Sequence, residues 1–85
     1  MATDVTFTLE YFNSEVCNFR ELMGNRDFMN DQKKKDAALH ALTFCYFNVE
    51  TKNDKEQTSL INIFNATIIE FNKRIELLAG LSNMA

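Results

Sequence analysis

The chain contains no proline, and its only glycines are Gly24 and Gly80. Proline and glycine are the residues that most often interrupt regular structure, so a chain that nearly lacks both favours long helices joined by short turns. Its 85 residues suffice for one domain. An apolar fraction of 46% is too high for a disordered chain. We therefore expect a single all-α domain over residues 1–85.

The most apolar stretch of the chain is Ala37–Val49. Three polar residues interrupt it: His40, Thr43 and Asn48. A helix that is apolar on most sides is normally buried on most sides. We therefore predict that this stretch forms the middle helix of a small bundle and that the rest of the chain packs around it.

The first segment carries two competing periodicities. Alternate residues are apolar at Val5, Phe7, Leu9 and Tyr11, which is a strand pattern. A longer pattern with steps of three and four residues is typical of a helix: Val5, Leu9, Phe12, Val16, Phe19 and Met23. The longer pattern predicts a helix over 4–23, capped by Thr3 or Asp4. The alternative, an extended 5–11 followed by a helix from Asn13 or Ser14, stays open.

The remaining boundaries follow from capping signals. Gly24 is predicted to end the first helix in a left-handed conformation. A loop over 25–30 then leads to a helix over 31–51, whose N-cap is Asn30 or Asp31. A third helix over 54–79 begins at a capping-box-like pair, Asn53 and Glu56, and ends at Gly80. Its core seam is the most regular in the chain: Gln57, Ile61, Phe64, Ile68, Phe71, Ile75 and Leu78.

Short connections force three such helices to run up, down and up, as a three-helix bundle. The main variant is a helical hairpin of the second and third helices, with the N-terminal helix crossing it or swapped onto a second chain. Because a chain this short has a thin stability margin, dimerisation could complete the bundle.

The sequence offers little for catalysis or cofactor binding. His40 is the only histidine, and it stands five residues before Cys45, so the two side chains do not share a helix face. We expect His40 to be partly buried with its ring hydrogen-bonded. One histidine and two isolated cysteines, Cys17 and Cys45, give no pair at metal-ligand spacing. We predict a protein that is not an enzyme and that binds no metal, cofactor or small-molecule substrate.

Targeting signals are also lacking. No basic start followed by an apolar run marks a signal peptide, and no stretch approaches the roughly 18 apolar residues of a membrane span. We therefore expect a cytoplasmic protein that does not enter membranes and keeps its cysteines reduced.

A single run of like charge, Lys33, Lys34 and Lys35, could form a basic patch with Arg20 and Arg26. The functional interpretation is a site for a phosphate backbone. A net charge of −3 argues against nucleic acid as the partner, since such surfaces normally carry a concentrated positive field. A solvated helix start, balanced by Asp31 and Asp36, explains the run more simply.

The more telling signal is a surplus of apolar residues once the core is filled. The predicted core seam of the middle helix is Ala38, Leu42, Cys45 and Val49. Phe44 and Phe47 point away from this seam, around His40, and Phe7, Tyr11 and Leu22 form a second face on the first helix. Contiguous exposed apolar surface usually marks an interface. The candidate partner-binding residues are Phe44, Phe47, His40, Tyr11 and Phe7. The alternative, in which the middle helix buries them between two neighbours, stays open.

These observations predict a small intracellular interaction module. It would regulate another protein as an adaptor or inhibitor, or associate with itself as a homodimer, through the aromatic surface of the middle helix. The alternative is a dimeric nucleic-acid-binding regulator that uses the Lys33–Lys35 patch.

Overall fold

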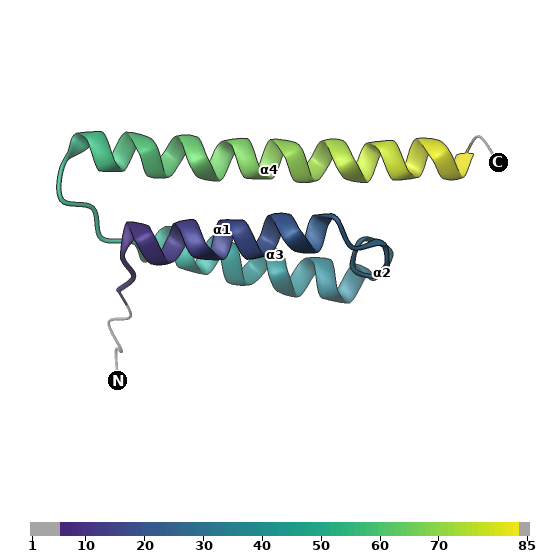
Figure 1. The fold of residues 1–85 in the computed structure, drawn as a ribbon, viewed down its shortest axis with the longest axis horizontal. Helices are drawn as coiled ribbons and strands as arrows, with labels where there is room; N and C mark the ends of the chain where they lie inside the picture. The colour runs from purple at the N-terminus through teal and green to yellow at the C-terminus, as the bar shows by residue number, and fades with distance from the viewer. Residues whose placement is uncertain (1–5, 84–85) are drawn as a thin grey trace.

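The computed structural model describes residues 6–83 and confirms a small all-α bundle (Figure 1). Its helices are α1 (Leu9–Met23), α2 (Arg26–Met29), α3 (Gln32–Phe47) and α4 (Asp54–Asn83). The three long helices run up, down and up, as the short connections required. α2, a single turn between α1 and α3, adds a fourth helix where a loop was expected.

α1 begins at Leu9, later than the predicted start of 4–23 and earlier than Asn13 or Ser14. The side-chain oxygen of Thr8 accepts a hydrogen bond from the Tyr11 backbone N–H at 3.0 Å and caps the helix. The expected caps, Thr3 and Asp4, lie outside the described residues.

Phe7 is extended and forms a parallel bridge with Val49. The Phe7 N–H donates to the Asn48 carbonyl, and the Glu50 N–H donates to the Phe7 carbonyl, both at 2.9 Å. Of the residues with the strand-like alternation, Phe7 forms the bridge, and those from Leu9 onward are helical. The same pairing takes residues 48–50 out of α3, which ends at Phe47 rather than near residue 51.

The turn after α1 differs from its prediction. Gly24 does follow the helix, but its φ of −82° is right-handed, so the expected left-handed cap is wrong. The chain keeps its right-handed sense, and the Asn25 side chain accepts from the Phe28 N–H at 3.0 Å to start α2. One turn later, Phe28 and Met29 are buried in the core. Burial of these two side chains explains why the connection is helical.

Two predicted N-caps are confirmed. The Asp31 carboxylate accepts from the Lys34 N–H at 3.1 Å, and the Asn53 side chain accepts from the Glu56 N–H at 2.9 Å. In a capping box the Glu56 carboxylate would accept from the Asn53 N–H. Here it accepts instead from the N–H of the preceding residue, Lys52. α4 continues through Gly80 to Asn83, and the predicted end at Gly80 is wrong.

α1, not the middle helix, is the element on which the bundle is built. α1 lies between α3 and α4 and packs against both, and α2 closes one end (Figure 1). Four residues of α1 are buried: Phe12, Val16, Phe19 and Met23. α3 buries only Leu42 and Cys45. The prediction that the 37–49 stretch is buried on most sides is therefore wrong, because α4 packs mainly on α1 and leaves the outer face of α3 uncovered.

The core joins the helices through aromatic rings. Tyr46 of α3 stacks on Phe64 of α4 with ring centroids 4.0 Å apart, and Phe12 of α1 lies against both rings. Phe19 and Phe71 are 5.1 Å apart further along. The seam of α4 runs through Leu60 and Thr67, both buried, while Ile61 is exposed. The predicted seam was therefore right at Phe64 and Phe71 but off by one residue at Ile61.

Candidate protein-binding surface

The aromatic side chains singled out from the sequence gather on one side of α1 and α3. Phe7 stacks on Tyr11 at a centroid distance of 4.9 Å and meets Phe44 edge-on at 6.1 Å. Tyr11 and Phe44 remain 46% and 49% exposed despite these contacts. Phe7 is half-buried beneath them. The structure thus brings together three predicted residues from two segments that are far apart in the sequence.

Phe47 and His40 extend this surface along the outer face of α3. Phe47 follows Phe44 by three residues, which makes the two side chains helix neighbours, and it is 76% exposed. The centroid of its ring lies 5.2 Å from that of Tyr46. His40 is exposed, which corrects the expectation of partial burial. We call Phe7, Tyr11, Phe44 and Phe47 the aromatic surface.

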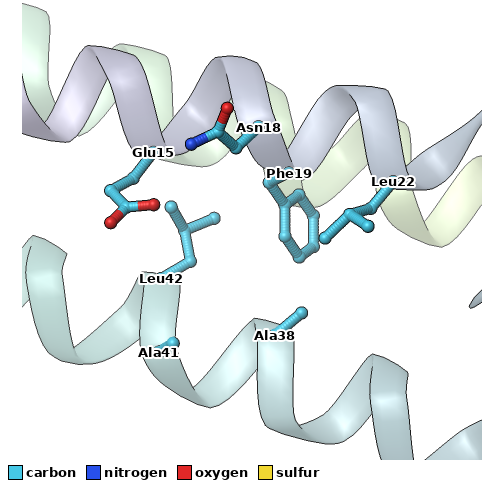
Figure 2. Close-up of a pocket in the computed structure, with 7 residues that line it drawn as sticks. All are labelled: Glu15, Asn18, Phe19, Leu22, Ala38, Ala41 and Leu42. Atoms are coloured by element: carbon cyan, nitrogen blue, oxygen red, sulfur yellow. The ribbon is translucent and has the colours of Figure 1, made fainter.

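A groove lies between α1 and α3 (Figure 2). Its volume is about 160 Å³, and it is lined by Glu15, Asn18, Phe19, Leu22, Ala38, Ala41 and Leu42. The small side chains of Ala38 and Ala41 leave the space, and Phe19 and Leu42 form its floor. Figure 2 shows α4 behind α1, so the groove opens on the side that α4 does not cover.

The groove residues of α1 belong to one stripe with the aromatic surface. Tyr11, Glu15, Asn18 and Leu22 follow one another at steps of four, three and four, which places them on one face of α1, and Phe7, which precedes the helix, stacks on Tyr11. Sequence analysis recognised the apolar members of this face but missed Glu15, Asn18 and the two alanines. The spacing along α1 could have indicated that Glu15 and Asn18 share this face. The position of the two alanines at the groove depends on how α3 packs against α1.

Glu15 dominates the electrostatics of this face. It raises the pKa of Tyr11 above the usual value, first through a hydrogen bond between the side chains and then through its negative charge. Burial raises the pKa of the Cys45 thiol, and Glu15 adds to the effect. The Cys45 thiol therefore stays protonated at neutral pH, facing the core, while His40 on the same helix is exposed. This arrangement gives the thiol no activating base.

One member of the predicted basic patch, Arg20, is paired with an acidic side chain of another helix. Arg20 faces α4, where its Nε lies 4.0 Å from the Glu70 carboxylate, and Arg74 shares that carboxylate at 3.6 Å. Arg26 is exposed on α2, and Lys33 and Lys34 are exposed in the first turn of α3. Lys35 is half-buried. The ion pair with Glu70 therefore holds the Arg20 side chain toward α4.

Other kinds of site find no support in the described part of the chain. Residues 6–83 hold no group of three histidine, cysteine or acidic side chains that could bind a metal ion. Cys17 and Cys45 are free, the first exposed and the second buried. Within the same range, no helix combines the length and apolarity needed to cross a membrane.

The fold and surface define a small all-α helical bundle with an exposed aromatic face. No protein-family model matches the chain, and neither the search of curated proteins nor that of solved structures returned a significant match.

Proposed function

We propose that the chain is a non-catalytic interaction module that binds another protein through the aromatic surface, acting as an adaptor or an inhibitor. The observation that carries the proposal is the cluster of Phe7, Tyr11 and Phe44, in which half-buried Phe7 contacts both other rings and those two rings stay open to solvent. Aromatic residues are the commonest anchors of protein interfaces, and exposed apolar patches mark such interfaces.

The cluster is also preorganised for binding. Phe7 is fixed by backbone hydrogen bonds to Asn48 and Glu50 and supports both exposed rings from below. A side chain that is already held in place loses little rotamer freedom when a partner covers it. Tyr11 and Phe44 therefore contribute apolar area at a low entropic cost, while Phe47 adds the most exposed ring of the set.

Affinity purification from the native host with matched variants tests the proposal. Phe44→Asp and Phe47→Asp place a charge in the aromatic surface, and Leu77→Asp places the same charge at a 67% exposed position of α4. We expect a specific protein to be retained by the wild type and by Leu77→Asp and lost by both other variants. Circular dichroism checks that all variants are folded.

Equal retention by all four proteins would contradict the proposal. Loss of helicity in Phe47→Asp would also count against it, because the ring would then support the core. Retention of the chain's own second copy, lost in the same variants, would assign the surface to self-association instead.

A further inference from the structure

The occupant of the α1–α3 groove can be inferred from its size, shape and charge, and this inference rests on the proposed function. The groove's volume of about 160 Å³ matches one ring or one branched aliphatic side chain, since a dry cavity of about 150 Å³ binds benzene. One side chain of a partner, rather than a small molecule of drug size, therefore fits it.

The surroundings of the groove suit a helix. Glu15, Asn18 and Leu22 of α1 form one wall and the alanines of α3 form the other, with the hollow between them (Figure 2). A helix that lies between two others contributes anchors at i, i+3 or i+4, and i+7. Seating one anchor on Ala38 and Ala41 would bring a second anchor, one or two turns away, onto Tyr11 and Phe44.

Glu15 defines the charge that the occupant must bring. Its carboxylate lies at the groove, between the aromatic surface and Leu22, and is already half-buried. Covering a carboxylate without an opposite charge is strongly unfavourable unless the group is neutralised. The occupant therefore needs a lysine or arginine beside its apolar anchor.

A second copy of the chain that docks antiparallel, with its Tyr11 in the groove, fits this face poorly. A two-fold axis pairs residue i with j and j with i, so seating Tyr11 over Phe19 of the other copy places residue 15 opposite residue 15. The two Glu15 carboxylates would then face each other across the interface. Like charges that are buried together are strongly unfavourable.

We propose that the groove binds an amphipathic helix of another protein, whose apolar side chain enters between Ala38 and Ala41 and whose neighbouring lysine or arginine pairs with Glu15. The partner is thus a basic amphipathic helix docked antiparallel or parallel to α1. Three variants address it directly: Ala41→Arg fills the groove, Asn18→Arg obstructs its α1 wall, and Glu15→Lys reverses its charge. Ala41 and Asn18 are exposed, so both substitutions are compatible with folding.

Selection from a displayed library of helical peptides, randomised on one face, tests this inference with the full chain as the target. We expect the enriched peptides to carry lysine or arginine next to a large apolar residue. A synthesised winner should bind Glu15→Lys at least about tenfold more weakly, and a peptide with glutamate in place of its cation should recover binding to that variant. Ala41→Arg and Asn18→Arg should both abolish binding.

Ala66→Arg is the matched control, since Ala66 is exposed and lines a separate hollow between α1 and α4. Enrichment of peptides without a cation, or binding that is unchanged in Glu15→Lys or Ala41→Arg, would overturn the inference. The inference would also be overturned if the wild-type chain enriched no more peptides than the Ala41→Arg protein does in the same selection. Sedimentation equilibrium showing a dimer that dissociates in Ala41→Arg would assign the groove to a second copy.

The two proposals fail in different ways. A cellular partner that is lost in Phe44→Asp but retained in Ala41→Arg and Glu15→Lys leaves the proposed function standing and removes the helix in the groove. A partner that is retained in Phe44→Asp removes the proposed function itself.

Discussion

At the scale of single residues, stability depends on a few rings that α1 presents to both neighbouring helices. Phe12 is fully buried and lies 6.1 Å from Tyr46 and 6.4 Å from Phe64, so it joins three helices. Phe47 carries the same side chain but is 76% exposed. Two residues of one type thus have opposite roles, and the difference is set by their positions around their helices.

Replacing Phe12 with alanine should lower the free energy of unfolding by about 3–5 kcal/mol, because a ring is removed from a site that cannot collapse. Phe47→Ala should change it by no more than about 0.5 kcal/mol. Urea denaturation of the two variants measures the contrast. If Phe12→Ala does not fold, Phe12→Leu keeps the comparison measurable. Similar losses for positions 12 and 47 would contradict the assignment of core and surface.

The hydrogen bond between Tyr11 and Glu15 makes a prediction about pH. The folded chain holds the Tyr11 phenol proton more tightly than the unfolded chain does, so the pKa of Tyr11 is raised above 10.0. The associated stability is present below that pH and is lost as the pH rises through the folded pKa. In a Tyr46→Phe background, phenolate absorbance should titrate later than in the same chain with Glu15→Gln. Identical titrations would show that Glu15 does not contact Tyr11.

At the scale of elements, the three long helices could be predicted in order and direction, whereas α2 and several helix ends could not. The heptad-like spacing from Leu9 to Met23 and the caps at Asp31 and Asn53 carry local information, and the structure confirms them. The start of α1 and the end of α3 depend on the pairing of Phe7 with residues 48–50, a contact between distant segments. α2 forms because Phe28 and Met29 reach the core.

Gly80 gives a direct test at this scale. Its backbone is helical, and a Cβ atom added there would meet nothing within 4 Å. Gly80→Ala should therefore raise the free energy of unfolding, by about 0.5–1 kcal/mol at most, because alanine favours the helix. A helix that ended at Gly80 with this residue in a left-handed conformation would make the same substitution destabilising. Urea denaturation and helical circular dichroism distinguish the two signs.

At the scale of the whole molecule, the bundle leaves one side of its central helix uncovered. α4 covers one side of α1, while the side that carries Glu15 and Leu22 stays open (Figures 1 and 2). The open side could be anticipated in part, because Phe7, Tyr11 and Leu22 share a face in the sequence. The groove could not, since it depends on how α3 crosses α1. Placing α1 rather than α3 at the centre explains why the most apolar stretch has an exposed face.

Photo-crosslinking in the native host tests the central claim, that this open side binds another protein. Benzoylphenylalanine replaces Phe44 in one protein and Leu77, on α4, in the control. We expect a discrete adduct from position 44, absent from position 77, whose second component is a different protein, identified by mass spectrometry. Equal adducts from both positions, or none from position 44, would contradict the claim. An adduct of two copies of the chain would show that the open side is used for self-association.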